Sequence, residues 1–180
     1  MKKIFTLLIL SVVLLAGCNV DKQTMVIHEK ESADFIEIKE TTTPKGFESI
    51  KGQSLSKPPE LTVSIVNKGI AAVCGTFSWF IDSGDGIVKC IEADSGPPNE
   101  LVKNQKESLY VKPNSRIFLS FESKPINYKV GIWENDKSIN QRVKNGEITT
   151  PREKGLVIYE VKAEWQQGTA IYAFAINMDL

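Results

Sequence analysis

The feature that most constrains the fold is a series of short β-branched and aromatic segments that begins at Glu60. Gly, Asn, Asp or Pro interrupts them about every ten residues, which is the spacing typical of all-β sandwiches. In residues 155–165, apolar side chains alternate with Glu160, Lys162 and Glu164, so one strand face packs and the other meets water. The pattern predicts an all-β fold, an antiparallel β-sandwich over residues 60–180.

The predicted strands have alternating or continuous apolar patterns bounded by turn residues. They cover residues 60–66, 69–74, 76–82, 86–92, 108–113, 115–122, 127–134, 139–143, 147–150, 155–165 and 168–177. Residues 67–69 and 83–85 are predicted as hairpin turns, because Gly supplies the positive φ that tight turns need. Residues 93–102 are predicted as a loop with at most one helical turn, since their two prolines cannot pair in a central strand.

The N-terminal residues 1–17 combine two lysines, a short apolar stretch and the small pair Ala16-Gly17, which is the layout of a secretory signal peptide. The apolar stretch is too short to be a comfortable permanent membrane span. Leu15-Ala-Gly-Cys18 resembles the lipobox of bacterial lipoproteins. The resemblance implies that Cys18 is acylated with a diacylglycerol group and becomes the mature N-terminus, held at the extracytoplasmic face of the cell membrane.

Residues 18–59 are rich in Lys, Glu, Thr and Ser and are predicted as the lipidated N-terminus followed by a flexible tether. Within it, residues 34–39 alternate apolar and charged side chains, as a half-buried strand does. Whether this strand joins the sheet of the folded domain stays open.

The segment Gly155-Leu-Val-Ile-Tyr-Glu-Val-Lys-Ala163 resembles the F strand of immunoglobulin-like domains. In that family a Tyr two residues before the Cys position forms the tyrosine corner, and Tyr159 would take that role here. Val161 stands at the Cys position, so the resemblance implies an immunoglobulin-like sandwich without the inter-sheet disulfide. It also places Trp133 in the core on the third strand.

The region from residue 58 to the end also resembles a group of uncharacterised lipoproteins of spore-forming Gram-positive bacteria. The resemblance lies in residues 75–80, 93–102, 119–125 and 153–165. It implies an exported, lipid-anchored β domain, and it implies neither a reaction nor a ligand.

Cys74 and Cys90 are the cysteines of the predicted domain, and an extracellular location permits a disulfide between them. A hairpin turn centred on Gly84-Asp85 places the two residues several positions out of register. That stagger exceeds the Cα separation of about 7 Å that a bridge allows. Two free thiols are favoured, and a bridge is the alternative.

The segment Asp82-Ser-Gly-Asp85-Gly places two carboxylates three residues apart, as some calcium loops do. No Glu follows at the spacing that an EF-hand requires, so a hairpin turn is favoured and no metal or other cofactor is expected. Phe80 is an apolar residue on the predicted wet face of its strand. With Asp82, Asp85 and Asp94 it forms a possible ligand-binding patch.

The composition argues against catalysis and against nucleic acid as a partner. The domain has no histidine, so Ser/His and Cys/His nucleophile systems are excluded, and no enzymatic activity is expected. Lys and Arg sum to 22, as do Asp and Glu, and the basic residues form no patch that attracts a polyanion.

We therefore expect a non-catalytic binding or interaction module at the cell envelope, whose partner is a protein or glycan. The alternative is a structural or protective envelope lipoprotein without a specific ligand, and an envelope hydrolase is a more distant one.

Replacing Cys18 with Ser tests the lipid anchor. Two or more acyl chains hold a protein durably at a bilayer, so their loss should release the variant into the medium or leave it unprocessed. Membrane fractionation after a high-salt wash measures this. Normal retention of the Cys18→Ser protein would contradict the anchor.

Overall fold

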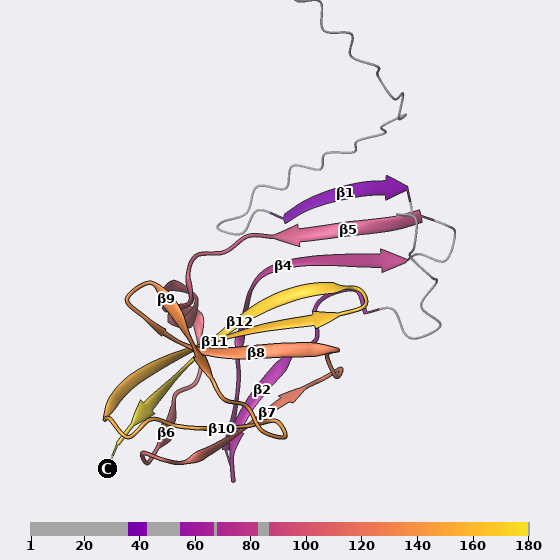
Figure 1. The fold of residues 1–180 in the computed structure, drawn as a ribbon. Coiled ribbons are helices and arrows are strands. Elements are labelled where there is room, and N and C mark those ends of the chain that lie inside the picture. Colours follow the sequence, from indigo (N-terminus) through magenta and orange to yellow (C-terminus); the bar gives the residue numbers. More distant parts are fainter. Residues whose placement is uncertain (1–35, 43–54, 67, 83–86, 180) are drawn as a thin grey trace, which may run out of the picture.

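The computed structural model describes residues 36–42, 55–66, 68–82 and 87–179. These residues form two β-sheets that pack face to face around an apolar core (Figure 1). The structure is mostly β and its sheets are antiparallel apart from one parallel pair, so the predicted all-β class and the sandwich are confirmed.

The larger sheet has eight strands in the order β1-β5-β4-β12-β11-β8-β9, and β6 pairs with β12 off this path. The strands are β1 Ile36–Thr42, β4 Val73–Asp82, β5 Ile87–Ala93, β6 Leu109–Val111, β8 Asn127–Glu134, β9 Lys137–Gln141, β11 Gly155–Trp165 and β12 Gly168–Met178. Figure 1 shows β1, β5 and β4 at the side of this sheet that lies farthest from the smaller sheet.

The smaller sheet has four strands in the order β10-β7-β2-β3. They are β2 Leu61–Ile65, β3 Lys68–Ala71, β7 Arg116–Phe121 and β10 Glu147–Thr149. One helical turn, α1 Pro98–Leu101, is followed by a 3-10 turn, η1 Val102–Asn104, as the loop prediction for residues 93–102 allowed.

The predicted strand positions agree with the structure to within a few residues, because alternation of apolar and polar side chains follows directly from burial of one sheet face. The β2–β3 turn is tighter than predicted, since Ile65 pairs with Lys68 and leaves two residues in the turn. The β4–β5 pairing is within one position of the predicted register, with Phe80 opposite Cys90.

The core is built around interlocking aromatic rings from both sheets. Trp79 and Trp165 meet edge to face at 5.6 Å between ring centroids, and Phe121 of the smaller sheet meets Trp165 at the same distance. Tyr159 and Phe174 stack at 4.8 Å on neighbouring strands. Edge-to-face and offset contacts of this kind add to the stability that burial alone supplies.

The final strand, β12, lies inside the larger sheet. On one side it pairs with β11 along its whole length. On the other side it pairs with β4 as far as Ala173 and then, in parallel, with β6 from Ile176 onward. The turn into β12 requires glycine: Gly168 has φ of 154°, and a Cβ there would collide with the carbonyl oxygen of Ser78 on β4.

The side chain of Gln105 fills the gap between β4 and β6. Its Nε2 donates to the carbonyl oxygen of Ala175 at 3.0 Å, and its Oε1 accepts from the Ala175 N–H at 2.7 Å. The amide of one side chain thus replaces a strand partner at Ala175, between the β4-paired and β6-paired parts of β12.

The tyrosine that fastens the fold through its hydroxyl is Tyr172, not Tyr159. Tyr172 donates to the carbonyl oxygen of Pro59 at 2.6 Å across 113 positions of sequence. Tyr159 is fully buried, and its hydroxyl has no hydrogen-bond partner among the described residues. The bond that would make Tyr159 a tyrosine corner is therefore missing, and the immunoglobulin-like assignment stays a prediction.

The expectation that Trp133 packs in the core is wrong. The neighbours that face the core on β8 are Val130 and Ile132, so alternation places Trp133 on the opposite face of the sheet. Trp133 is half-buried there, and the core tryptophans are Trp79 and Trp165.

Residues on the N-terminal side of the predicted domain boundary at residue 60 also pack against the folded domain. Strand β1 overlaps the predicted strand 34–39 and pairs with β5 at the edge of the larger sheet. Leu55 accepts a hydrogen bond at its carbonyl oxygen from Trp79 Nε1 at 2.9 Å, and Pro58 and Pro59 are buried.

Removing the two buried hydroxyl groups one at a time should give opposite results. Tyr172→Phe leaves the Pro59 carbonyl without its donor and should lower the free energy of unfolding by about 1–3 kcal/mol. Tyr159→Phe removes a buried hydroxyl that has no partner among the described residues, so it should leave stability unchanged or raise it. Urea unfolding followed by tryptophan fluorescence compares them, and equal losses would contradict this assignment.

Candidate functional site

Three of the four residues predicted as a ligand patch, Phe80, Asp82 and Asp94, lie in the described part of the chain. Phe80 and Asp82 are half-buried on β4 and both have interaction partners within the protein. Asp85 lies outside the described residues, as do the predicted lipid attachment residue Cys18 and the rest of the Asp82–Gly86 turn. No group of three His, Cys, Asp or Glu side chains that could hold a metal ion occurs in the described ranges.

Asp94 holds the loop that follows β5. Its carboxylate accepts from the hydroxyl of Thr76 at 3.2 Å and from the N–H of Ser95 at 2.9 Å. The Ser95 N–H also donates to the Thr76 hydroxyl at 3.1 Å. Asp94 is separated from Phe80 by the last residues of the hairpin, in which Phe77 pairs with Ala93. The structure therefore assigns Asp94 a local structural role.

Cys74 and Cys90 are free thiols in the structure, as in the favoured alternative. Cys90 lies opposite Phe80 on β4, whereas Cys74 lies opposite Tyr172 on β12. Phe80 is six positions beyond Cys74 on the same strand, a separation of about 20 Å at the usual strand rise. Desolvation raises the pKa of the Cys74 thiol to about 11, against a smaller opposing effect of Lys57. The thiol is therefore protonated and weakly nucleophilic at neutral pH.

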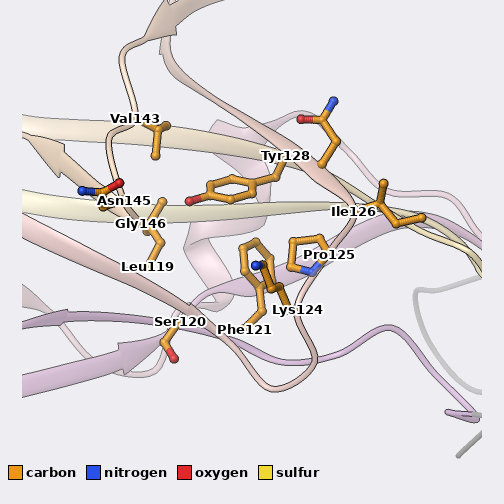
Figure 2. Close-up of a pocket in the computed structure, with 11 residues that line it drawn as sticks. Leu119, Ser120, Phe121, Lys124, Pro125, Ile126, Tyr128, Val143, Asn145 and Gly146 are labelled. Carbon is orange, nitrogen blue, oxygen red and sulfur yellow. The ribbon is translucent and has the colours of Figure 1, made fainter. Parts of the chain in front are cut away.

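An open groove of about 580 Å³ lies between the β7–β8 connection and the β9–β10 connection. Figure 2 shows Phe121 and Tyr128 at its centre, with Val143 and Leu119 to one side and Pro125 to the other. Its lining residues come from two strands and two connections: Leu119, Ser120, Phe121, Lys124, Pro125, Ile126, Asn127, Tyr128, Val143, Asn145 and Gly146. The volume falls within the range of about 300–1,000 Å³ typical of small-molecule sites.

The first wall of the groove is the β7–β8 connection, which is fastened to the end of β11. The carbonyl oxygen of Ser123 accepts from Trp165 Nε1 at 2.9 Å, and the N–H of Ile126 donates to the carbonyl oxygen of Glu164 at 2.8 Å. Pro125 between them is buried, while Ile126 is 67% exposed. The wall is thus rigid and presents one large apolar side chain to solvent.

The second wall is a two-residue turn between Lys144 and Glu147. Asn145 and Gly146 have φ of 53° and 77°, as the two central residues of a type I′ turn require. Lys144 and Glu147 exchange backbone hydrogen bonds of 2.9 Å in both directions, and the Gly146 carbonyl oxygen accepts from Leu119 of β7 at 2.8 Å. This second wall is also fixed by backbone geometry.

The floor is aromatic. Phe121 and Tyr128 meet edge to face at 5.2 Å between ring centroids, and Phe121 continues into the core through Trp165. Partial burial raises the pKa of Tyr128 above its usual value of about 10, so its hydroxyl is neutral and can donate or accept a hydrogen bond.

The sequence analysis missed this groove because no motif marks it. The alternation in residues 127–134 places Tyr128 among core residues, and only the tertiary structure shows that Tyr128 lies where the core opens to solvent. The two walls are also separated by β8 and β9 in the sequence, and their proximity follows from strand order. The Asn145-Gly146 dipeptide was the one local signal that a rigid turn lay here.

Comparison with known protein families gives a match at the N-terminus. The family described as prokaryotic membrane lipoprotein lipid attachment site matches residues 1–19, which supports a membrane-anchored bacterial lipoprotein with Cys18 at the matched site. No curated protein and no solved structure matches the chain. None of the helical segments in the described ranges is long and apolar enough to cross a bilayer.

Replacing Gln105 with Ala tests the two hydrogen bonds between the Gln105 side chain and the backbone of Ala175, which we call the Gln105 bridge. The change leaves both backbone groups of the buried Ala175 unpaired and should lower the free energy of unfolding by about 1–3 kcal/mol. Gln141→Ala is the matched control, because it removes one exposed hydrogen bond of 3.2 Å and should cost less than about 0.5 kcal/mol. Similar denaturation midpoints for the two variants would contradict the bridge.

Proposed function

We propose that this protein is a lipid-anchored, non-catalytic binding module at the extracytoplasmic face of the cell membrane, and that the groove floored by Phe121 and Tyr128 is its ligand site. The observation that supports the proposal is an aromatic floor open to solvent between two fixed walls. The lipobox match supports the anchor. A tethered domain of this kind would hold its ligand close to the membrane surface.

The rigidity of the walls favours binding. Backbone hydrogen bonds fasten Ile126 on one side and Gly146 on the other, so little chain entropy is lost when a ligand enters. Several polar side chains at the groove have no hydrogen-bond partner among the described residues, and these can turn to a ligand: Ser120, Lys124, Asn127, Tyr128 and Asn145. An apolar floor with a few convergent polar groups is the usual composition of a ligand site.

The lining residues favour binding over catalysis. All eleven are described, and they include no His, Cys, Asp or Glu that could act as a nucleophile, general acid or general base. The titratable groups are the Lys124 amine and the Tyr128 hydroxyl. The exposed patch expected around Phe80 is a weaker site, because Phe80 and Asp82 already have partners within the protein.

Retention of cell-envelope material tests the proposal. The full-length lipoprotein in detergent micelles is immobilised and exposed to peptide, glycan and lipid fractions of an envelope digest. Wild type should retain one fraction, and Tyr128→Ala should lower the retained amount at least about tenfold by removing the floor. Ile126→Ser, a change at an exposed position, provides a second groove variant that leaves the core intact.

Tyr110→Ala is the matched control, since Tyr110 is 57% exposed and lies on β6, outside the groove lining. Its retention should equal that of wild type. Equal retention by the groove variants would show that the site lies elsewhere. Failure of wild type to retain any fraction would favour the structural lipoprotein.

A further inference from the structure

We propose that the groove binds a saccharide that carries an acidic group, with a sugar ring packed on Tyr128 and the acid beside Lys124. This inference rests on the proposed function, because it names the ligand class of the same site.

The charge of the groove favours an anion. Lys124 is the one charged residue among the eleven that line it, and no carboxylate is present to compensate. Lys124 is exposed and has no ion-pair partner among the described residues, so its amine is available to a ligand. Figure 2 places Lys124 beside Phe121 and Pro125, at the lower side of the aromatic floor. An acid bound there would meet a positive charge that no carboxylate among the lining residues offsets.

The remaining chemistry of the groove matches a sugar ring. A pyranose has an apolar C–H face and a rim of hydroxyl groups, and the groove offers an aromatic floor with polar side chains around it. Tyr128 presents both a ring surface and a neutral hydroxyl. Asn127 and Asn145 supply amide donors and acceptors, which can pair with hydroxyl groups of either orientation.

An extended peptide is the competing occupant. β10 pairs with β7 only as far as Phe118, and β9 pairs with β8 only from Val130 onward, so the strand segments that line the groove have a strand partner on one side only. A peptide that adds to a sheet edge is held mainly by main-chain hydrogen bonds. Such a ligand would show no preference for an acid at Lys124, so the effect of charge on affinity distinguishes it from an acidic saccharide.

Three defined probes test the inference on the full-length lipoprotein in micelles. They are a β-1,4-linked N-acetylglucosamine tetrasaccharide, the same chain with a carboxylate on alternate sugars, and the same chain with a terminal phosphate monoester. Titration calorimetry should give at least about tenfold tighter binding for one or both acidic probes than for the neutral one. Because the Lys124 amine is exposed, that advantage should shrink in high salt.

Two variants locate the contacts. Lys124→Gln should bring the acidic and neutral probes to equal affinity, whereas Lys154→Gln, at an exposed lysine outside the groove lining, should preserve the difference. Tyr128→Ala should weaken binding of every probe, and a urea unfolding curve checks that this variant is folded.

Equal affinity for neutral and acidic probes would overturn the inference, as would no binding of either acidic probe or an unchanged preference in Lys124→Gln. Tighter binding of an apolar octapeptide than of the acidic saccharides would overturn it in favour of a peptide ligand. In each of these cases the proposed function would still be supported if wild type retains envelope material and the groove variants Tyr128→Ala and Ile126→Ser do not. If wild type and these variants retain the same amount, the proposed function and this inference are both wrong.

Discussion

The fold depends on satisfying every backbone polar group of β12 while both faces of that strand are buried. Residues 172–176 of β12 are all buried, so water cannot serve as a hydrogen-bond partner there. The protein meets this requirement with three successive partners along one edge: an antiparallel strand, a side-chain amide and a parallel strand. The positions of β4, of the loop after β5 and of β6 all follow from this constraint.

Sequence patterns predicted the strands well because burial of one sheet face has a period of two residues, and this period is a local property. Tyr159 and Val161 face the core as alternation requires. The same rule cannot distinguish Tyr159 from Tyr172, since both are inward residues on long strands. What separates them is whether an acceptor lies opposite the hydroxyl, and for Tyr172 that acceptor is 113 positions away in the sequence. Trp133 was misplaced for a related reason, because a large aromatic residue does not by itself reveal which strand face is covered.

The candidate site was missed because neither of its walls carries a recognisable motif. Pro125 and the Asn145-Gly146 turn are ordinary connections when considered singly, and only strand order brings them to opposite sides of Tyr128. The patch expected at Phe80 and Asp94 gains no support from the structure: alternation predicted an exposed Phe80, which is half-buried, and the exposed carboxylate of Asp94 fastens a loop. A polar side chain in a proline-containing loop can have a structural role or a functional one. Its hydrogen bonds within the protein show whether it has a structural role.

The position of β12 also has a consequence for how the chain reaches its folded state. Trp79 of β4 and its partner Gly168 are 89 residues apart, and β12 is the last strand to be synthesised. Three strands, β4, β6 and β11, pair with it. A chain that crosses a membrane N-terminus first therefore cannot complete the larger sheet until its final residues emerge. Pairings between such distant segments form slowly, and until then the strands that await β12 have exposed edges that other chains can bind.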